Sequence, residues 1–522
     1  MTIKVKYFLF ITCFLFQHSY AQQVYERNNL EVNYFLSSMS QKGYIEWNDL
    51  ILPITKEKIN EALLDLKSKK YILNPVEQLE LEFYVKEYSN HRKKLLYKTD
   101  SLFSINLDPI ASVGYYHYGN KNIKESSVGT SIWGSIGNKF GFQLSFQDIN
   151  QTGPRFDNSV EPFFKDGIRG IISINDPNNL QRTNFIDLRG SILYRFKKGI
   201  ISIGQDALTW GYGENGQLVL SNKAPYYPYI RIDYEPLHWL RFNYTHAFLQ
   251  SNIIDSANIY PIPSRIFPAS REVFIKKYMA SHSIDIRLKK GIHFSIGESI
   301  IYNDQLQLGY LLPTMFFKAY DNLINKGIIQ AGSNGQFFGQ FNTKNILVKK
   351  SQFYSTLFID EIRVSSIFDP IQSRNQIGFN IGFIKQDFIL PNLIIGGEYT
   401  RLNPFLYRNF LPAQNYTSND YLLGDWIGAN SDKSIFYIRY TPIPRLKLYL
   451  RQQFVRNGSD GTMYDQYYGK PQMPFMQKLV LKQQTLFFKV SYEPSNRLVL
   501  NFNYTRISSI GNQYFMGLSF GL

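Results

Sequence analysis

Three glycines in the stretch GYGENG, residues 211–216, have the G-x-G-x-x-G spacing that brings a backbone turn close to the pyrophosphate of a dinucleotide. This chemistry needs a buried strand before the glycines and a helix after them. The residues that follow, QLVLSNKAPYYPYIRIDY, contain two prolines and then alternate apolar and polar side chains. Because this pattern indicates an extended chain and not a helix, we predict that the chain uses no cofactor.

Other residue patterns that support catalysis are missing from the sequence. GLSFG (517–521) has the G-x-S-x-G spacing but lies in the alternating C-terminal segment rather than at a strand-to-helix turn, so it is no nucleophile elbow, and there is no H-E-x-x-H zinc helix. The seven histidines are scattered, and His117, His282 and His293 fit a girdle or lumen position better than a metal site. Glu298 and Asp360 are the two carboxylates that catalysis would use, but an ion pair with a lumenal arginine explains them equally well. We predict no enzymatic activity, no catalytic residue and no metal site.

The first 21 residues have the features of a secretory signal. Lys4 and Lys6 precede an apolar run of ten residues, 7–16, and Ser19-Tyr20-Ala21 forms a cleavage site. The single cysteine, Cys13, would be removed with this segment. The segment has two lysines and no acidic residue, so its removal lowers the formal charge from +16 to +14. An exported basic chain is expected to meet anionic lipopolysaccharide or acidic glycans rather than nucleic acid.

The remaining composition and patterning indicate a transmembrane β-barrel. Aromatic residues make up 16% of the chain, with 38 tyrosines and 41 phenylalanines, and no apolar run after residue 21 is long enough for a membrane helix. From about residue 105 the sequence alternates apolar and polar side chains, as in FIDLRGSILYRF (185–196), HSIDIRLKK (282–290), RLKLYLRQQF (445–454) and TLFFKVSY (485–492). This period of two, repeated many times, predicts an all-β barrel of about 16–18 antiparallel strands at residues 105–522.

Turns and the C-terminus support the barrel interpretation. YEPLHWLRFNYT (234–245), YTPIPRLKLYL (440–450) and YEPSNRLVLNFNYT (492–505) each predict a strand, a tight turn and a strand, with the turns on the periplasmic rim. The end, YFMGLSFGL, is apolar at alternate residues up to Leu522, as expected of a final barrel strand. Longer outer loops are expected at 148–182, 254–279 and 455–480, and the glycines of residues 211–216 are expected to form a bend between two strands.

Residues 22–104 predict a small α-helical element on the periplasmic side, either a separate domain or a plug. TKEKINEALLDLK (55–67) has Thr55 as N-cap and an apolar face of Ile59, Ala62, Leu63 and Leu66. A second helix, 74–88, has Asn74 as N-cap and Glu77 in a capping-box position, with Val76, Leu79 and Phe83 as its apolar stripe.

The stretch GQDALTWGYGENGQLVLSNKAPYYPYIRI (204–232) resembles the Wzi-type capsule-assembly barrels, which share a W-G-x-G segment, a leucine-rich strand, L-S-N and a proline-aromatic-proline run. GESIIY (297–302), YLLP (310–313), LFIDEI (357–362) and the helices before the barrel are similar to that family as well. The resemblance implies an outer-membrane barrel that helps to hold capsular polysaccharide at the cell surface. A related group of barrels linked to gliding motility is an alternative that the sequence leaves open.

The predicted interior of the barrel is rich in cations. Strand parity places these charged side chains inside: Asp187, Arg189, Arg195, Arg231, Asp233, Arg241, Asp285, Arg287, Glu398, Arg439, Lys447, Arg451 and Lys489. They either cross-link a plugged lumen or attract an acidic glycan. The residues predicted to bind the glycan are Arg189, Arg195, Trp210, Tyr227, Tyr229, Arg231, Arg241, Arg287, Arg439 and Arg451.

We therefore predict an exported outer-membrane barrel that binds or helps to assemble surface polysaccharide without catalysis. Its expected partners are outer-membrane lipid, lipopolysaccharide and the polysaccharide. A component of gliding motility or surface secretion, with protein partners from that machinery, and a passive channel are the alternative functions.

Overall fold

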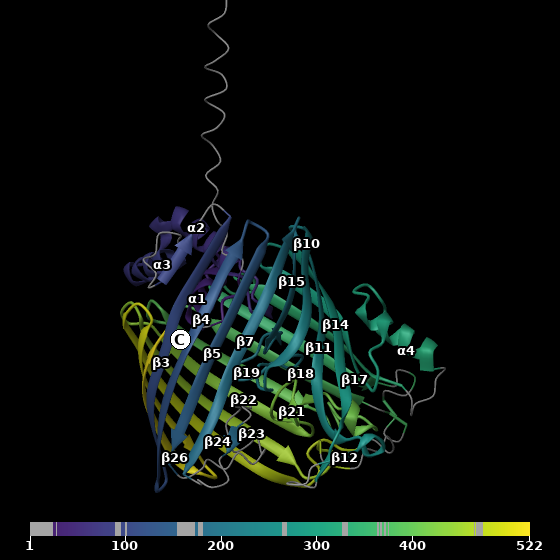
Figure 1. The fold of residues 1–522 in the computed structure, drawn as a ribbon. Coiled ribbons are helices and arrows are strands. Elements are labelled where there is room, and N and C mark those ends of the chain that lie inside the picture. Colours follow the sequence, from purple (N-terminus) through teal and green to yellow (C-terminus); the bar gives the residue numbers. More distant parts are fainter. Residues whose placement is uncertain are drawn as a thin grey trace, which may run out of the picture.

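The computed structural model describes residues 24–27, 29–88, 96–99, 102–153, 173–175, 181–263, 269–325, 332–362, 365, 368–369, 372–373, 375–463, 465 and 473–521. The predicted signal, Cys13 and Leu522 lie outside these residues, as do parts of the predicted outer loops 148–182 and 455–480. Figure 1 shows a closed barrel with helices at one end. Within the described residues, no helix is both long enough and apolar enough to cross a bilayer.

The barrel has eighteen antiparallel strands in the part of the chain that the structure describes, which confirms the predicted fold class. They are β3 (Phe103–Tyr118), β4 (Lys121–Ile136), β5 (Phe140–Thr152), β7 (Arg182–Phe196), β8 (Gly199–Asp206), β10 (Tyr227–Leu237), β11 (Leu240–Ile254), β14 (Phe274–Lys289), β15 (Ile292–Asn303), β16 (Asn334–Lys344), β17 (Ser351–Ile362), β18 (Asn375–Lys385), β19 (Leu393–Leu402), β22 (Ser431–Tyr440), β23 (Leu446–Gly458), β24 (Leu479–Ser495), β25 (Leu498–Ile507) and β26 (Gly511–Phe520).

The last strand closes the barrel against the first. β26 pairs with β3 from Gln513 opposite Tyr118 to Phe520 opposite Ala111. The sheet therefore has no free edge at this seam, and the backbone N–H and C=O groups of both strands are paired as a bilayer interior requires. Two short strands extend this sheet locally: β2 (Leu96–Thr99) on β3 and β6 (Ser173–Asn175) on β7.

Apolar side chains cover the outside of the barrel and polar ones face inwards. In β7, Ile186, Leu188 and Ile192 are exposed on the outer face, whereas Asp187 and Arg189 lie on the inner face. The alternating residues of β26 behave in the same way, with Tyr514, Met516, Leu518 and Phe520 exposed. The alternation of apolar and polar residues in the sequence therefore corresponds to side chains that point alternately to the apolar outer surface and to the polar lumen.

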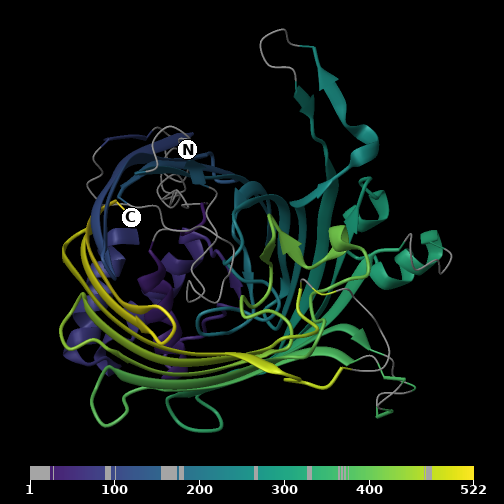
Figure 2. The same ribbon diagram turned by 90° about the horizontal axis from the view of Figure 1, so that it is seen from below.

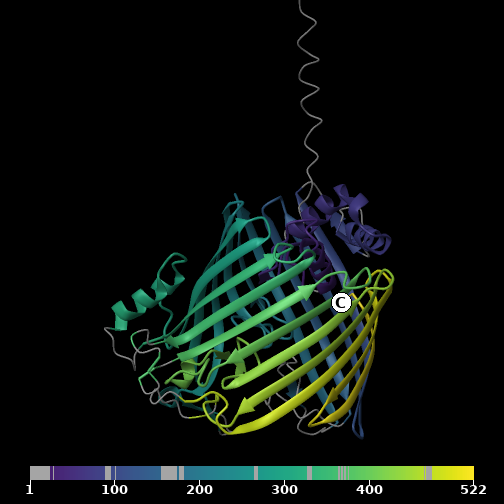
Figure 3. The same ribbon diagram turned by 180° about the vertical axis from the view of Figure 1, so that it is seen from behind.

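The tight turns predicted from the proline-containing repeats all lie at the end of the barrel that the helices cover (Figures 1 and 3). The chain turns between β10 and β11 through residues 238–239, between β22 and β23 through residues 441–445, and between β24 and β25 through residues 496–497. Arg445 and Arg497 have positive φ angles of 66° and 64°, which reverse the chain within these short connections. We call this the tight-turn end, and the opposite end the loop end.

The N-terminal helical element consists of α1 (Leu30–Gln41), α2 (Lys56–Ser68) and α3 (Pro75–Tyr88), with a 3₁₀ turn, η1 (Lys70–Ile72). The two predicted caps are present. Thr55 Oγ1 accepts a hydrogen bond from the Lys58 amide, and the Asn74 and Glu77 side chains each accept one from the other residue's amide. The sequence did not predict α1, which packs against α2 and α3 through Leu36 and Met39.

The predicted apolar stripe of α3 is wrong. Leu79 is exposed, and the helix instead buries Leu81, Tyr84 and Tyr88 together with Glu77 and Glu80. The two carboxylates are buried because each contacts a lysine: Glu77 contacts Lys42, and Glu80 Oε2 lies 2.6 Å from Lys447 Nζ on the barrel wall. The buried face of this helix therefore combines an apolar contact with the rest of the helical element and ion pairs to Lys42 and to Lys447 of the barrel wall.

Two loops fold from the loop end into the lumen, where Figure 2 shows them with the helices inside the ring of strands. The first lumen loop, residues 207–226, contains the glycines of 211–216, so the predicted simple bend between strands is wrong. The second lumen loop spans residues 403–430. The loops are bonded to each other, since the hydroxyls of Tyr407 and Tyr416 donate to the carbonyls of Leu218 and Val219 at 2.5 and 2.9 Å.

An apolar core inside the lumen joins the lumen loops to the wall and to the helical element. Trp210 and Leu218 of the first loop and Trp426 of the second pack against inward side chains such as Met279 and Phe338. A short strand, β9 (Thr209–Trp210), also pairs with β1 (Ile51–Leu52) of the helical element. The second loop contains η7 (Pro412–Gln414), β20 (Thr417–Ser418) and β21 (Tyr421–Leu422).

The described parts of two further long connections lie outside the barrel wall. Residues 255–273 contain η3 (Ser256–Asn258) and a hairpin of β12 (Tyr260–Ile262) and β13 (Ala269–Arg271), within the predicted outer loop 254–279. Residues 304–333 contain η4 (Leu308–Leu311) and α4 (Phe317–Asn325), which Figures 1 and 2 show outside the ring of strands.

The outward orientation of the strands is testable at Val128, which lies in the middle of β4 and is 71% exposed. We expect Val128→Arg to lower the stability of the inserted barrel by about 2–4 kcal/mol, because a lipid-facing arginine at the midplane is costly. Asn122→Arg, on the same face near the end of β4, is the matched control, with an expected cost of about 0–1 kcal/mol. Urea unfolding from lipid vesicles measures both, and equal costs would contradict the assigned orientation.

Candidate functional site

The charged side chains expected inside the barrel point into the lumen, and many of them bind the elements that fill it. Arg195 contacts Glu57 of α2, and Arg287 contacts Glu46 of the helical element. Lys447 contacts Glu80, as described above. The lumenal cations of the tight-turn end therefore hold the helical element in place.

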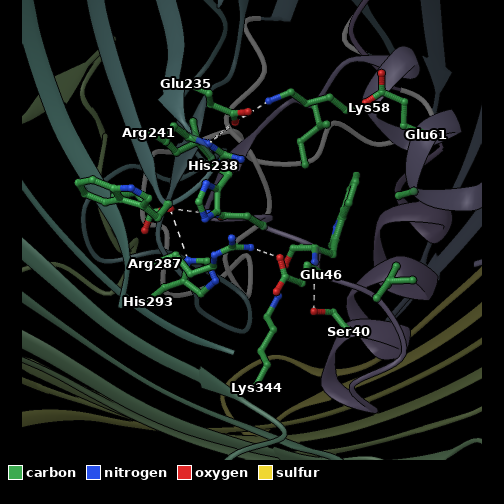
Figure 4. A pocket seen from close by; sticks show the side chains of 18 of the residues that line it. Ser40, Glu46, Lys58, Glu61, Glu235, His238, Arg241, Arg287, His293 and Lys344 are labelled. Atoms are coloured by element: carbon green, nitrogen blue, oxygen red, sulfur yellow. Dashed lines mark hydrogen bonds and ion pairs between the residues drawn. The ribbon is translucent and has the colours of Figure 1, made fainter. Parts of the chain in front are cut away.

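A cavity of about 710 Å³ lies at the tight-turn end between the helical element and strands β10, β11, β14 and β15, and we call it the rim cavity. Figure 4 shows its charged lining. Glu235 accepts from both Lys58 Nζ at 2.6 Å and Arg241 Nε at 2.7 Å. His293 Nδ1 lies 3.6 Å from Asp285. Three predicted binding residues, Arg231, Arg241 and Arg287, line this cavity.

Arg231 is a buried cation in the lining of the rim cavity. Its guanidinium makes an ion pair with Asp233, with Nε 2.9 Å from Oδ2, and donates to the Pro53 carbonyl at 3.2 Å. The guanidinium also lies 5.2 Å from the centre of the Tyr25 ring. Arg231 therefore joins strand β10 to the helical element, and the cavity contains acids and cations in close alternation.

A second cavity, of about 550 Å³, lies deeper between α1, α3, the first lumen loop and strands β17, β19 and β22–β24. We call it the inner cavity. Arg439 Nη2 donates to both carboxylate oxygens of Glu214 at 2.9 Å, and the Tyr449 hydroxyl donates to Glu214 Oε1 at 2.6 Å. The Arg439 guanidinium also lies 4.3 Å from the Tyr34 ring centre and 5.0 Å from that of Tyr449.

The inner cavity combines cations, aromatic faces and amides. The Arg451 guanidinium lies 5.2 Å from the Phe487 ring centre. Lys489, which is on the same strand as Phe487, β24, also lines the cavity. Among the described residues, no ion pair or hydrogen bond engages the Lys489 ammonium. Cations beside aromatic rings are suited to an acidic ligand with apolar ring faces. Of the predicted binding residues, Arg439 and Arg451 lie here.

The glycines of residues 211–216 shape the loop that forms one wall of the inner cavity. A Cβ on Gly213 would lie 2.1 Å from the Gly216 carbonyl oxygen, and Gly216 has a φ of 140°. These two positions allow the loop to fold on itself and bring Glu214 to Arg439. The glycine spacing therefore serves a compact loop in the lumen.

The remaining predicted binding residues lie away from both cavities or within packed cores. Arg189 Nε contacts Asp187 at 2.9 Å and lies beside the Tyr226 ring. Trp210 and Tyr229 are buried, with Trp210 Nε1 donating to Ser283 at 3.0 Å and Tyr229 accepting from Arg27 at 3.5 Å. Tyr227 is buried in the same core as Trp210. Contact of these side chains with a ligand stays a prediction.

The two carboxylates considered for catalysis have structural partners other than the expected arginines. Asp360 faces the lumen and accepts hydrogen bonds from the Tyr407 amide at 2.8 Å and from Gln336 at 3.2 Å. Glu298 lies on the outer face and accepts from the Phe317 amide at 2.7 Å. In the described part of the chain, no group of three or more potential metal ligands comes together.

Sequence reasoning missed most of the inner cavity. Tyr34 lies on the unpredicted helix α1, and Glu214 was read as part of a bend between strands. Strand parity places Lys489 in the lumen, but it is not among the predicted binding residues, and neither is Tyr449. Parity gives the side of the wall, but which lumenal residues border a cavity depends on how the two loops and the helices fill the interior.

No family model and no curated protein matches the sequence. Among solved structures, the fold is similar to Wzi of Escherichia coli, described as an outer membrane protein involved in group 1 capsule assembly and a carbohydrate-binding β-barrel. The TM-score is 0.60 at 12% identity, and the match covers 96% of this chain and 100% of that chain. This likeness shows the fold. It agrees with the resemblance to Wzi-type barrels that the sequence indicates.

Two channel-type structures match less of the chain. OccK5 of Pseudomonas aeruginosa has a TM-score of 0.42 at 10% identity, and the match covers 80% of this chain and 97% of that chain. OccAB1 of Acinetobacter baumannii has a TM-score of 0.42 at 11% identity, with 80% and 96% covered.

Asp49 of the helical element and Glu214 of the first lumen loop both contact the barrel wall, and both have a shifted pKa. We call the helical element and the two lumen loops together the lumen fillings. Burial alone would raise the pKa of Asp49, but Lys344 Nζ, 2.8 Å away, outweighs it and holds the pKa below its usual value. Burial likewise opposes ionisation of Glu214, and Arg439 lowers its pKa. Asp49 also accepts from the Tyr212 hydroxyl at 2.8 Å, so it joins the helical element, the first lumen loop and strand β16.

We expect the lumen fillings to lose stability as the pH falls below about 4, the usual range of free carboxyl groups. Because both pKa values are lower in the folded state, ionised Asp49 and Glu214 stabilise it above this pH, and the contribution disappears on protonation. Guanidinium unfolding followed by tryptophan fluorescence between pH 7 and pH 3 measures this loss. Asp49→Asn and Glu214→Gln should each flatten the profile, and unchanged profiles in both variants would contradict the assignment.

Proposed function

We propose that this chain is a non-enzymatic outer-membrane protein that binds surface polysaccharide or assists its assembly. The observation that carries the proposal is the inner cavity, where Arg451, Lys489 and Phe487 border the same space inside the lumen. Acidic sugars offer carboxylate or phosphate oxygens for the cations and a ring face for the aromatic side chain. The cavity volume is in the range of ligand pockets.

The similarity of fold to Wzi supports the same proposal. That protein is described as carbohydrate-binding, and the match extends over the whole of it and over the helical element of this chain. The apolar outer surface of the barrel supports a place in the outer membrane, with lipid and lipopolysaccharide around it. The tight-turn end and the helical element would then face the periplasm.

Two alternatives predict different properties. A passive channel requires an open path, but the two lumen loops, the wall and the helical element share a packed apolar core. A component of gliding motility or surface secretion would use the barrel as an anchor, and it would co-purify with proteins of that machinery rather than with glycan. The proposed absence of catalysis is supported by the structural hydrogen bonds of Glu298 and Asp360.

Binding of acidic and neutral oligosaccharides to the detergent-solubilised protein at low salt tests the proposal. We expect acidic glycans to bind and Lys489→Ala to weaken binding by roughly tenfold or more, because a charge-assisted hydrogen bond contributes about 1.5–3 kcal/mol. Lys482→Ala removes the same charge from the same strand, at an exposed position on its outer face, and should leave the affinity unchanged.

Absence of glycan binding by the intact protein at low salt would overturn the proposal. An equal loss in the Lys489→Ala and Lys482→Ala variants would show general attraction to a basic surface and contradict a site in the inner cavity. Heat-modified mobility on gels establishes that both variants are folded barrels.

A further inference from the structure

From β15 the chain leaves the wall at the loop end and turns back along the outside of the barrel, in the connection to β16. We call its described part, residues 304–325, the outer-wall segment. It contains η4 and α4, and Figures 1 and 3 show α4 beside the wall at a level within the height of the barrel. The first residue of α4, Phe317, contacts Glu298, which lies near the middle of β15 (Ile292–Asn303). The segment therefore reaches the depth at which the wall faces hydrocarbon.

The wall under the segment carries polar groups that are out of place on a lipid-facing surface. Glu298 accepts from the Phe317 amide at 2.7 Å and lies 3.2 Å from His282 Nε2. His246 Nε2 lies 2.7 Å from the Tyr302 hydroxyl. These side chains are on the outer face, because their neighbours Ile284 and Ile296 on the same faces of β14 and β15 are exposed. A bare carboxylate or imidazole in hydrocarbon is costly, so the segment is needed to cover them.

The cover is held by further contacts. The Tyr244 hydroxyl of the wall donates to the Tyr310 carbonyl at 2.8 Å. The Phe317 ring packs on the His282 ring, with centroids 4.5 Å apart, and Tyr310 packs on Tyr302 at 4.7 Å. The segment therefore has a defined place on the wall.

The part of the segment that packs on the wall buries an acid and exposes leucines. Asp321 of α4 is only 4% exposed and accepts from the Ser333 amide at 3.0 Å and from the Asn325 side chain at 2.7 Å, whereas Asp304, at the loop end of the segment, is exposed. The leucines point outwards: Leu308 is 74% exposed and Leu323 is 76% exposed. A loop in water would bury the leucines and expose the acid. A buried acid and outward leucines in η4 and α4 match a surface in contact with lipid.

We propose that the outer-wall segment lies in the outer leaflet, with Leu308, Leu312, Phe316 and Leu323 in contact with lipid acyl chains, and that it seals Glu298 and His282 from the bilayer. The acyl chains are the occupant because the exposed leucines continue the apolar outer surface of the wall, as the packing of Phe316 on Phe337 of β16 shows, with centroids 6.2 Å apart. The inference depends on the proposed membrane location and is independent of glycan binding.

Single cysteines report the environment of the segment, because Cys13 is the one native cysteine and is replaced by serine for the test. Leu323→Cys and Leu308→Cys are labelled with an environment-sensitive fluorophore and reconstituted in vesicles of phosphatidylcholine brominated in mid-chain. Ile296→Cys on the bare wall is the lipid control, and Asn258→Cys, at an exposed position of η3, is the water control. We expect both leucine positions to lose about as much fluorescence as Ile296→Cys, and to resist aqueous iodide.

This inference would be overturned if Ile296→Cys were quenched while neither leucine position was quenched and both were open to iodide. That result would leave the membrane location intact. Absence of quenching at Ile296→Cys as well would instead contradict the membrane location.

Discussion

A barrel of eighteen strands encloses more space than its own side chains fill, and this constraint determines the rest of the molecule. Eight strands make an interior that side chains can pack, whereas sixteen to eighteen leave an aqueous channel unless other parts of the chain enter. Here three parts enter. The helical element occupies the tight-turn end, the first lumen loop meets it through the pairing of β1 with β9, and the second lumen loop is hydrogen-bonded to the first.

The filling is attached to the wall by both packing and charge. The lumen core contains large apolar side chains from the loops and from the wall, such as Leu218, Trp426 and Phe358. Around it, lumenal cations contact acids of the helical element, as in Lys447 with Glu80 and Arg497 with Glu87. The number of lumenal cations counted from the sequence is therefore larger than the number that a ligand can contact. Most of that charge is neutralised locally, and Lys489 in the inner cavity is an exception among the described residues.

The sequence predicts the wall well because a bilayer imposes a simple rule on it. Alternation in stretches such as residues 185–196 reports directly which side chains meet lipid, and the N-caps Thr55 and Asn74 report where two helices begin. The lumen obeys no comparable rule. QLVLS in the first lumen loop has the composition of a strand, yet Leu218 and Leu220 are buried among loops, because inside a barrel apolar residues need no period.

The same reasoning explains the individual errors. Glu77 and Glu80 are inside because lysines lie opposite them, which no pattern within the α3 sequence shows. Glu298 was assigned an inward partner because a carboxylate on a lipid-facing wall is unexpected, and only the position of α4 shows how it is covered. In each case the deciding partner lies far away in the chain, so local sequence does not contain the information.

The closed lumen is the central claim, and ion conductance in planar lipid bilayers tests it most directly. An open porin recorded in the same membranes establishes the current of an unobstructed barrel of similar size. With the helices and both loops in place, the intact protein should insert without a steady current. A stable, porin-like current from the intact folded chain would contradict the account, because it would require a continuous aqueous path through the packed core.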